Sequence, residues 1–394
     1  MRHFLEVIAF YILIHTGHVN ALEIYLANED VDAISESLTL NGGINVETAA
    51  LGKYKLSVVA TGLGGTQTNP MPGNGTGIGD LSNGQFILEK QSGPLQLYAV
   101  VGSYSMPELG VPYNQASKNV KNTWGYLPSG WIKIPANQFL SFSVGKLSAI
   151  GGLESTFTYQ NINIQRGLLW HQTSSITRGM QVDYEDDCLS VSLAWTDGAY
   201  SNTYNWFGAQ IGYRLDYKND VTASWNGSLS ANSMQNDATS LLGNNSQIST
   251  LIYSYKGDHF TVSPYLQYTF VPIRPSIGIL GSSNTKGAAV LATYRLYASD
   301  ENGKLSRNNL SFPLRLEYIT SGGNSYISSN NLLYGPNSSA VSATFTPTYQ
   351  MGMYFARAEA SYVKAINSSA GTTFGQNGMA NAQFRFLLEG GILY

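Results

Sequence analysis

ANAQFRFLLEGGILY, residues 380–394, is the stretch of the chain that decides the fold. Every second residue from Ala382 to Tyr394 is apolar or glycine, whereas the alternate positions carry the charges Arg385 and Glu389. Because successive side chains of a strand point to opposite faces, the pattern predicts a long strand with one apolar and one charged face. Such a strand at the C-terminus is typical of the closing strand of a bacterial outer-membrane β-barrel. An amphipathic edge strand of a soluble sheet is the alternative.

The N-terminal residues 1–21 look like a secretory signal peptide, with a basic start, an apolar run over 4–14 and a small-residue cleavage site ending at Ala21. The apolar run is shorter than the roughly 20 residues that a membrane-spanning helix needs, which disfavours an uncleaved anchor. We therefore predict cleavage after Ala21. Residues 22–37 are acidic and show no alternation, so they are predicted to form a short periplasmic lead before a barrel over 38–394.

The composition is that of a chain with few charges and many small polar residues. Charged residues make up 12% of the sequence, whereas about 25% is usual. The net charge of −3 offers no basic surface for nucleic acid, and the single cysteine, Cys188, excludes an intrachain disulfide. No later segment is long and apolar enough for a membrane-spanning helix, so a membrane-embedded chain must cross as strands of a closed barrel. A secreted β-solenoid or adhesin has a similar composition.

Segments with strand-like alternation recur from about residue 36 to the end of the chain, as in 207–217, 260–270 and 354–362. About ten residues are what a tilted strand needs to cross the hydrocarbon of a bilayer. Short turns alternate with long connections rich in Asn, Ser, Gly and Pro, and this rhythm is typical of outer-membrane barrels. The predicted long connections are 62–83, 105–137, 232–246, 272–285, 321–339 and 365–379.

Seventeen segments qualify as strands, but a single-chain bacterial barrel has an even number. The weakest candidates are 36–47 and 52–61. We therefore predict an all-β protein, a transmembrane antiparallel up-and-down β-barrel of about 16 strands. A barrel of about 18 strands is the alternative if 148–170 contains another crossing.

The charges of the best strands share the parity opposite to the apolar residues. An arginine facing lipid at mid-membrane costs roughly 2–4 kcal/mol, so these side chains are predicted to face the lumen. A barrel of about 16 strands is wide enough for an aqueous channel, which makes the charges candidate pore-lining residues. The alternative for each is a pair across the lumen that only braces the wall. The candidates are Arg214, Asp216, Arg295, Arg315, Glu317, Arg357, Glu359, Arg385 and Glu389.

The longest predicted connection, 105–137, combines charges with tryptophans and tyrosines. Long loops without secondary structure of their own are usually functional or disordered, and the aromatic residues argue against disorder. The loop is predicted either to fold into the barrel and narrow the pore or to lie on the outer surface. In the first case Glu108, Lys118 and Lys121 are candidate constriction charges.

Residues 145–184 contain four short motifs, and with them this block resembles the OmpL-like family of β-barrel porins. The motifs are Gly145-Lys146-Leu147, the stretch from Glu154 to Tyr159, the run from Asn163 to Trp170, and the stretch from Arg178 to Val182. The resemblance implies an outer-membrane location and passive transfer of solutes, and it brings no catalytic residues. It also implies a polar cluster inside the wall, with a structural salt bridge as the alternative, made of Glu154, Arg166 and Arg178.

The last residue, Tyr394, supplies a further resemblance. Outer-membrane barrel proteins typically end in an aromatic residue that their insertion machinery reads, which implies the barrel-assembly machinery as a partner. Outer-membrane lipids, small ions and polar solutes are the other expected partners. The sequence pattern does not decide whether the oligomeric state is a homotrimer or a monomer.

Catalytic and cofactor chemistry has little support in the sequence. Beyond the predicted cleavage site the histidines are His171 and His259, and the sequence has no HxxxH or CxxC motif and no phosphate-binding glycine loop. We therefore predict no enzyme and no cofactor.

The pattern and the resemblance together indicate a porin, a passive diffusion channel for ions and small hydrophilic solutes. A non-conducting barrel that acts as an adhesin or surface scaffold through its long loops is the alternative, and the ion preference is open.

Overall fold

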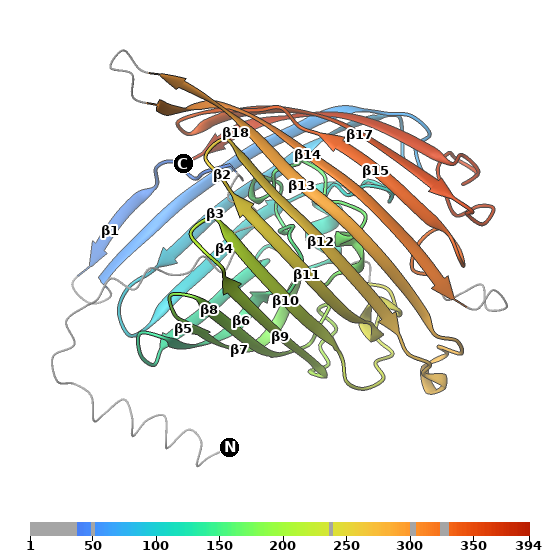
Figure 1. The fold of residues 1–394 in the computed structure, drawn as a ribbon, viewed down its shortest axis with the longest axis horizontal. Helices are drawn as coiled ribbons and strands as arrows, with labels where there is room; N and C mark the ends of the chain where they lie inside the picture. Colours follow the sequence, from blue (N-terminus) through green and yellow to red (C-terminus); the bar gives the residue numbers. More distant parts are fainter. Residues whose placement is uncertain (1–37, 49–51, 236–238, 300–304, 324–330) are drawn as a thin grey trace.

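The computed structural model describes residues 38–48, 52–235, 239–299, 305–323 and 331–394. The predicted signal peptide 1–21 and lead 22–37 lie outside the described residues. The described chain forms one antiparallel sheet that curls round and closes into a barrel (Figure 1).

Sixteen strands form the wall, as the sequence predicts. One of these strands is interrupted, because β15 and β16 follow one another between β14 and β17. The elements of the wall are β2 (Gly52–Gln67), β3 (Gly77–Lys90), β4 (Gln96–Tyr104), β5 (Ser129–Pro135), β6 (Leu140–Ser148), β7 (Ile176–Glu185), β8 (Leu189–Thr196), β9 (Trp206–Arg214), β10 (Asn219–Ser228), β11 (Gln247–Lys256), β12 (Phe260–Val271), β13 (Ser283–Ser299), β14 (Leu305–Gly323), β15 (Ser339–Phe345), β16 (Thr348–Met351), β17 (Tyr354–Ile366) and β18 (Ala382–Leu393).

The C-terminal strand closes the barrel, which confirms the prediction from residues 380–394. β18 pairs with β17 on one edge and with β2 on the other, from Arg385 to Leu393. Glycine allows the backbones to approach closely at this seam, because a Cβ at Gly65 would lie 2.0 Å from the carbonyl oxygen of Phe386. An extra strand, β1 (Ile44–Thr48), pairs with the first residues of β2 and forms a short hairpin with it.

The alternation along each strand separates an apolar outer face from a polar inner face. On β18, Phe384 and Leu388 are 41% and 53% exposed, whereas Arg385 and Glu389 are buried. Apolar side chains on the outer parity recur on the neighbouring strands. In a barrel this outer belt faces lipid, and the inner parity faces the lumen.

Short turns and longer loops alternate along the chain, as predicted. Two predicted connections, 62–83 and 105–137, are longer than the loops in the structure, which are 68–76 and 105–128. The glycine-rich ends of β2 and β3 carry few apolar side chains, so the strands continue past the point where alternation is visible. Trp131 likewise belongs to β5 and not to a loop.

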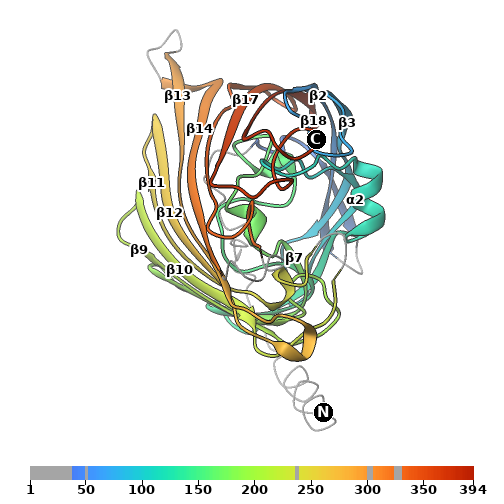
Figure 2. The same cartoon turned by 90° about the vertical axis from the view of Figure 1, so that its right-hand side faces the viewer.

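Residues 149–175, between β6 and β7, turn into the barrel and occupy its interior (Figure 2). We call them the inner segment. This described segment contains no strand, so the alternative of an extra crossing within 148–170 is wrong. Its regular structure consists of two short 3-10 helices, η2 (Thr158–Gln160) and η3 (Trp170–Gln172). Residues 161–170 are all buried, so the segment is part of the protein core.

The remaining helices lie in the longer loops. α2 (Ala116–Asn122) lies against β3 and β4 at the edge of the ring of strands (Figure 2). The 3-10 helices η4 (Gly243–Asn245) and η5 (Pro275–Ile277) precede β11 and β13. In the part of the chain that the structure describes, no helix has both the length and the apolar character to cross a membrane.

Candidate functional site

Acidic side chains of the barrel wall bind the backbone of the inner segment. Glu317 on β14 accepts hydrogen bonds from the amides of Leu168 (3.1 Å) and Leu169 (3.2 Å). Glu359 on β17 accepts hydrogen bonds from the amides of Ile164 and Gln165. An irregular buried segment has no neighbouring strand to satisfy its amides, and an unpaired buried amide costs about 1–3 kcal/mol. These carboxylates therefore take the place of strand partners.

Basic side chains of the same strands bind the carbonyl groups of the inner segment. Arg315 on β14 donates to the carbonyl oxygen of Gln165 at 2.6 Å. Arg357 on β17 donates to the carbonyl oxygens of Asn161 (2.9 Å) and Thr158 (2.8 Å). A guanidinium presents its donors in a fixed fork, so one arginine can satisfy two carbonyl groups at once.

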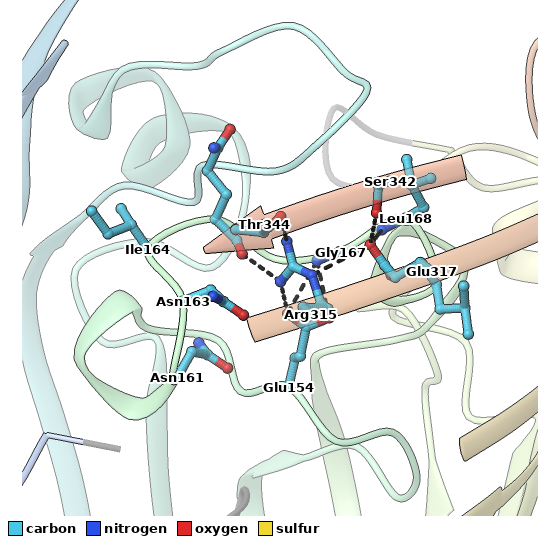
Figure 3. Close-up of polar contacts among 12 residues, drawn as sticks. Glu154, Asn161, Asn163, Ile164, Gly167, Leu168, Arg315, Glu317, Ser342 and Thr344 are labelled. Atoms are coloured by element: carbon cyan, nitrogen blue, oxygen red, sulfur yellow. Dashed lines mark hydrogen bonds and ion pairs between the residues drawn. The ribbon is translucent and has the colours of Figure 1, made fainter. Parts of the chain in front are cut away.

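The charges are also paired with one another (Figure 3). Arg315 lies between Glu154 of the inner segment and Glu317, whose carboxylate is 3.3 Å away. Arg357 and Glu389 pair at 2.5 Å across β17 and β18. These side chains are at most 3% exposed. Removing one partner of a buried ion pair typically costs about 3–5 kcal/mol, so the network holds the inner segment firmly against β14, β17 and β18.

Six of the predicted pore-lining residues are buried in contacts with the inner segment or with one another, namely Arg315, Glu317, Arg357, Glu359, Arg385 and Glu389. Arg295 is buried on β13. Arg214 is the last residue of β9, and its side chain is exposed. Asp216 therefore lies beyond this strand, in the turn that follows it. The amide of Lys218 donates to the Asp216 carboxylate at 2.8 Å and lowers its pKa. The prediction that Asp216 belongs to a strand is therefore wrong.

The predicted polar cluster inside the wall forms only in part, because Glu154 and Arg166 interact electrostatically but Arg178 is bonded elsewhere. Glu154 and Arg166 both belong to the inner segment, whereas Arg178 on β7 pairs with Asp197 at 2.7 Å. The Arg166 guanidinium lies 5.1 Å from the centroid of the Trp170 ring, and burial lowers its pKa to about 10. The family resemblance implied one cluster, but Arg178 lies on the wall and pairs with Asp197, whereas Glu154 and Arg166 lie on the inner segment.

The predicted constriction loop contacts the inner segment at its beginning and again around α2, where Val120 and Trp124 belong to the same buried apolar cluster as Phe157. The amide of Leu109 donates to the carbonyl oxygen of Arg166 at 2.9 Å, so this part of the loop lies beside the inner segment. Glu108 accepts a hydrogen bond from His171 at 2.9 Å. Lys118 and Lys121 are exposed on α2, at the edge of the ring, so the structure does not unite the three candidate charges. The inner segment, and not 105–137 as a whole, fills the lumen.

The part of the lumen away from the buried charges contains a cavity of about 320 Å³. It lies between residues 148–153 and the inner faces of β5 and of β7 to β11. We call it the side cavity. Its lining includes hydroxyl and amide side chains, among them Gln181, Ser190, Ser192, Gln210, Thr222 and Ser254.

The lumen narrows where residues 149–152 meet the wall. Two smaller cavities, of about 50 and 20 Å³, share Ser148 and Ala149 with the side cavity. The side-chain amide of Asn226 on β10 donates to the carbonyl oxygen of Ile150. Gly151 and Gly152 have φ angles of 97° and 91°, which favour glycine and let the chain turn sharply. The sequence analysis did not identify Ile150 or Asn226 as functional residues. The glycine pair that follows Ile150 was the local signal that the chain turns there.

Comparison with known proteins agrees with this architecture. Residues 54–394 match the family described as "Putative beta-barrel porin-2, OmpL-like". The chain belongs to this porin family. A search of curated proteins found no match.

The OmpL-like porin also resembles solved porin structures, at identities that show the fold alone. OmpF of Salmonella typhi in complex with daunomycin has a TM-score of 0.55 and 12% identity, over 88% of this chain and 99% of that one. The anion-selective porin from Comamonas acidovorans has a TM-score of 0.54 and 11% identity, over 85% and 99%. OmpT of Vibrio cholerae, described in its trimer form, has a TM-score of 0.53 and 12% identity, over 86% and 98%.

The family and the fold together identify an outer-membrane porin of bacteria and indicate a channel rather than an enzyme. Within the described ranges, no group of three or more His, Cys, Asp or Glu side chains could hold a metal ion.

Replacing Ile150 with alanine should raise the single-channel conductance of the OmpL-like porin, because this residue lines both the side cavity and the neighbouring cavity of about 20 Å³. Conductance in planar bilayers measures the effect. Ile164→Ala is the matched control, since Ile164 packs against Leu63, Ile78 and Leu387 on the filled side of the lumen. An equal change in the two variants would mean that Ile150 does not restrict the path.

Proposed function

We propose that this OmpL-like porin is a passive diffusion channel for ions and small hydrophilic solutes, with its path along β5 to β11. The observation that carries the proposal is the asymmetry of the lumen. Residues 154–169 of the inner segment are bonded to β14, β17 and β18, whereas the side cavity of about 320 Å³ lies against β5 and β7 to β11. Solutes follow their own gradients through such a path, so no cofactor or energy input is required.

The proposed path is expected to select only weakly between cations and anions. The side cavity is lined by three basic and four acidic side chains, namely Lys133, Arg214, Lys256, Asp183, Glu185, Asp186 and Asp220. Lys256 and Asp220 approach to 3.2 Å, so part of this charge is neutralised locally. Charges of opposite sign at such distances largely cancel in the potential that a passing ion experiences.

Planar-bilayer recordings in a potassium chloride gradient test both statements. We expect step-like openings and a reversal potential close to zero, with a small preference for cations. Lys256→Gln leaves Asp220 without its nearer basic partner and should shift the reversal potential further toward cations. A reversal potential near that of an ideally anion-selective channel would contradict the proposed path.

The runner-up is a non-conducting barrel that adheres to a partner through its long loops. The same recordings separate the two functions, because a membrane that contains the folded barrel and remains electrically silent would favour the adhesin. The family match weighs against this alternative.

We further propose that the barrel is a homotrimer, with outer-membrane lipids around it and with the barrel-assembly machinery as the partner that inserts it. The likeness to OmpT in its trimer form supports this oligomeric state. The mass of the unheated protein in detergent, measured by light scattering, tests it.

A further inference from the structure

We infer that the side cavity selects neutral polyhydroxylated solutes, of the size and chemistry of small sugars, over charged solutes of equal size. The inference rests on the proposed function, since it concerns the solute that the same path takes. It draws on three features of the lumen, which are the position of the buried charges, the balance of the remaining charges and the chemistry of the wall between them.

The first feature is that the strongest charges of the lumen are unavailable to a solute. Arg315, Glu317, Arg357 and Glu359 are at most 5% exposed. Their donors and acceptors are bonded to the inner segment and to each other. A charged solute in the side cavity therefore gains no direct contact with them.

The second feature is that several of the charges bordering the side cavity already have partners. Asp220 lies 3.7 Å from Arg214 and 3.2 Å from Lys256. Asp183 accepts hydrogen bonds from Ser192 (2.6 Å) and Gln181 (2.8 Å). Apart from the Asp183 Oδ2, which is buried without a hydrogen-bond partner among the residues that the structure describes, these charges are engaged. A solute ion would have to compete with their contacts, and it would lose hydration in a narrow space.

The third feature is the hydroxyl and amide chemistry of the wall. β8, β9, β10 and β11 present Ser192, Gln210, Thr222 and Ser254 to the side cavity. A hydroxyl group donates one hydrogen bond and accepts others, and a side-chain amide also does both. The hydroxyl groups of a sugar have the same dual character, so the wall can replace their water without leaving a group unpaired. Neutral hydrogen bonds have a modest net strength of about 0.5–1.5 kcal/mol, which permits release as well as entry.

The volume fits this class of solute. The side cavity of about 320 Å³ is at the lower end of the roughly 300–1,000 Å³ that small-molecule sites occupy. A single sugar ring is therefore a better match than a long oligosaccharide. The narrowing at Ile150 and Asn226 imposes a further limit on size.

Liposome swelling tests the inference with three probes of similar size, namely glucose, gluconate and glucosamine. Proteoliposomes that contain the full-length barrel should take up glucose at least several-fold faster than either charged probe. Uptake of a charged probe at the rate of glucose or faster, with ion conductance present, would overturn the sugar inference and leave the porin proposal standing. Absence of both conductance and swelling would overturn the porin proposal and the inference with it.

A pair of matched variants tests the role of the hydroxyl groups. Thr222→Val with Ser254→Ala removes two hydroxyl groups that border the side cavity, and should slow glucose uptake several-fold. Ser224→Ala with Thr250→Val is the control on the same strands, β10 and β11, because these two buried hydroxyl groups bond each other at 2.6 Å. Equal slowing of glucose in both variants would overturn the inference. Heat-dependent mobility on gels verifies that both variants are folded barrels.

Discussion

Deleting residues 153–172 should raise the single-channel conductance several-fold. The deletion removes most of the inner segment from a barrel whose sixteen strands, without a filling segment, enclose an aqueous channel. The ends to be joined are already close, because a Cβ at Gly152 would lie 3.9 Å from the Thr173 methyl group. The amide of Ala149 also donates to the carbonyl oxygen of Ser175 at 2.9 Å, so a linker of one or two glycines can close the gap without strain.

A control replacement separates this effect from general damage to the loops. Replacing η5 (Pro275–Ile277) with three glycines removes a loop helix that has no buried residue and takes no part in the apolar clusters of the inner segment. We expect the conductance of this variant to stay close to that of the parent protein. If the inner-segment deletion also conducted like the parent, the restriction would have to lie elsewhere in the barrel.

Arg315→Met should lower the stability of the folded barrel by about 3–5 kcal/mol, the usual cost of removing one partner from a buried ion pair. The substitution leaves the Glu154 and Glu317 carboxylates buried without their shared cation. It also leaves the carbonyl group of Gln165 without its donor. The temperature at which the unboiled barrel unfolds on gels measures the change.

A compensated variant distinguishes loss of the charge pair from loss of the side chain itself. Arg315→Met combined with Glu154→Gln and Glu317→Gln removes all three charges, and the glutamine oxygens can still accept from the amides of Gly167 and Leu168. Neutral replacement of a whole buried ionic group is often tolerated, so most of the stability should return. A compensated variant as unstable as Arg315→Met would show that the charges themselves are not the source of the loss.

The wall of the barrel could be predicted from the sequence because the face that each side chain takes depends only on its neighbours in the chain. Phe384, Arg385 and Phe386 are neighbours in the chain, and the geometry of any strand places the arginine opposite the two rings. The same argument predicted the closing role of β18 and the count of sixteen strands, and the structure confirms both. It was less successful at the ends of β2 and β3, where glycines provide no side chain to reveal the alternation.

The inner segment could not be predicted from local pattern because its partners lie far away in the chain. Leu168 bonds Glu317 across 149 positions, and Thr158 bonds Glu389 across 231. Its alternating residues around Asn163 resemble a strand, so the sequence itself invites the interpretation of an extra crossing. Contacts of this kind exist only after the barrel has brought the wall and the segment together.

The alternation of apolar and polar side chains in the sequence was enough to predict a closed barrel with an apolar, lipid-facing surface and a polar lumen. The reason is that strand geometry assigns each residue to one face. Only the tertiary structure decided what the inward charges do. Residues such as Arg315 and Glu359 satisfy the backbone of a buried irregular segment, whereas hydroxyl and amide side chains of β8 to β11, together with a few charged ones, border the side cavity. The physical reason is that a buried backbone must find hydrogen-bond partners wherever the fold supplies them.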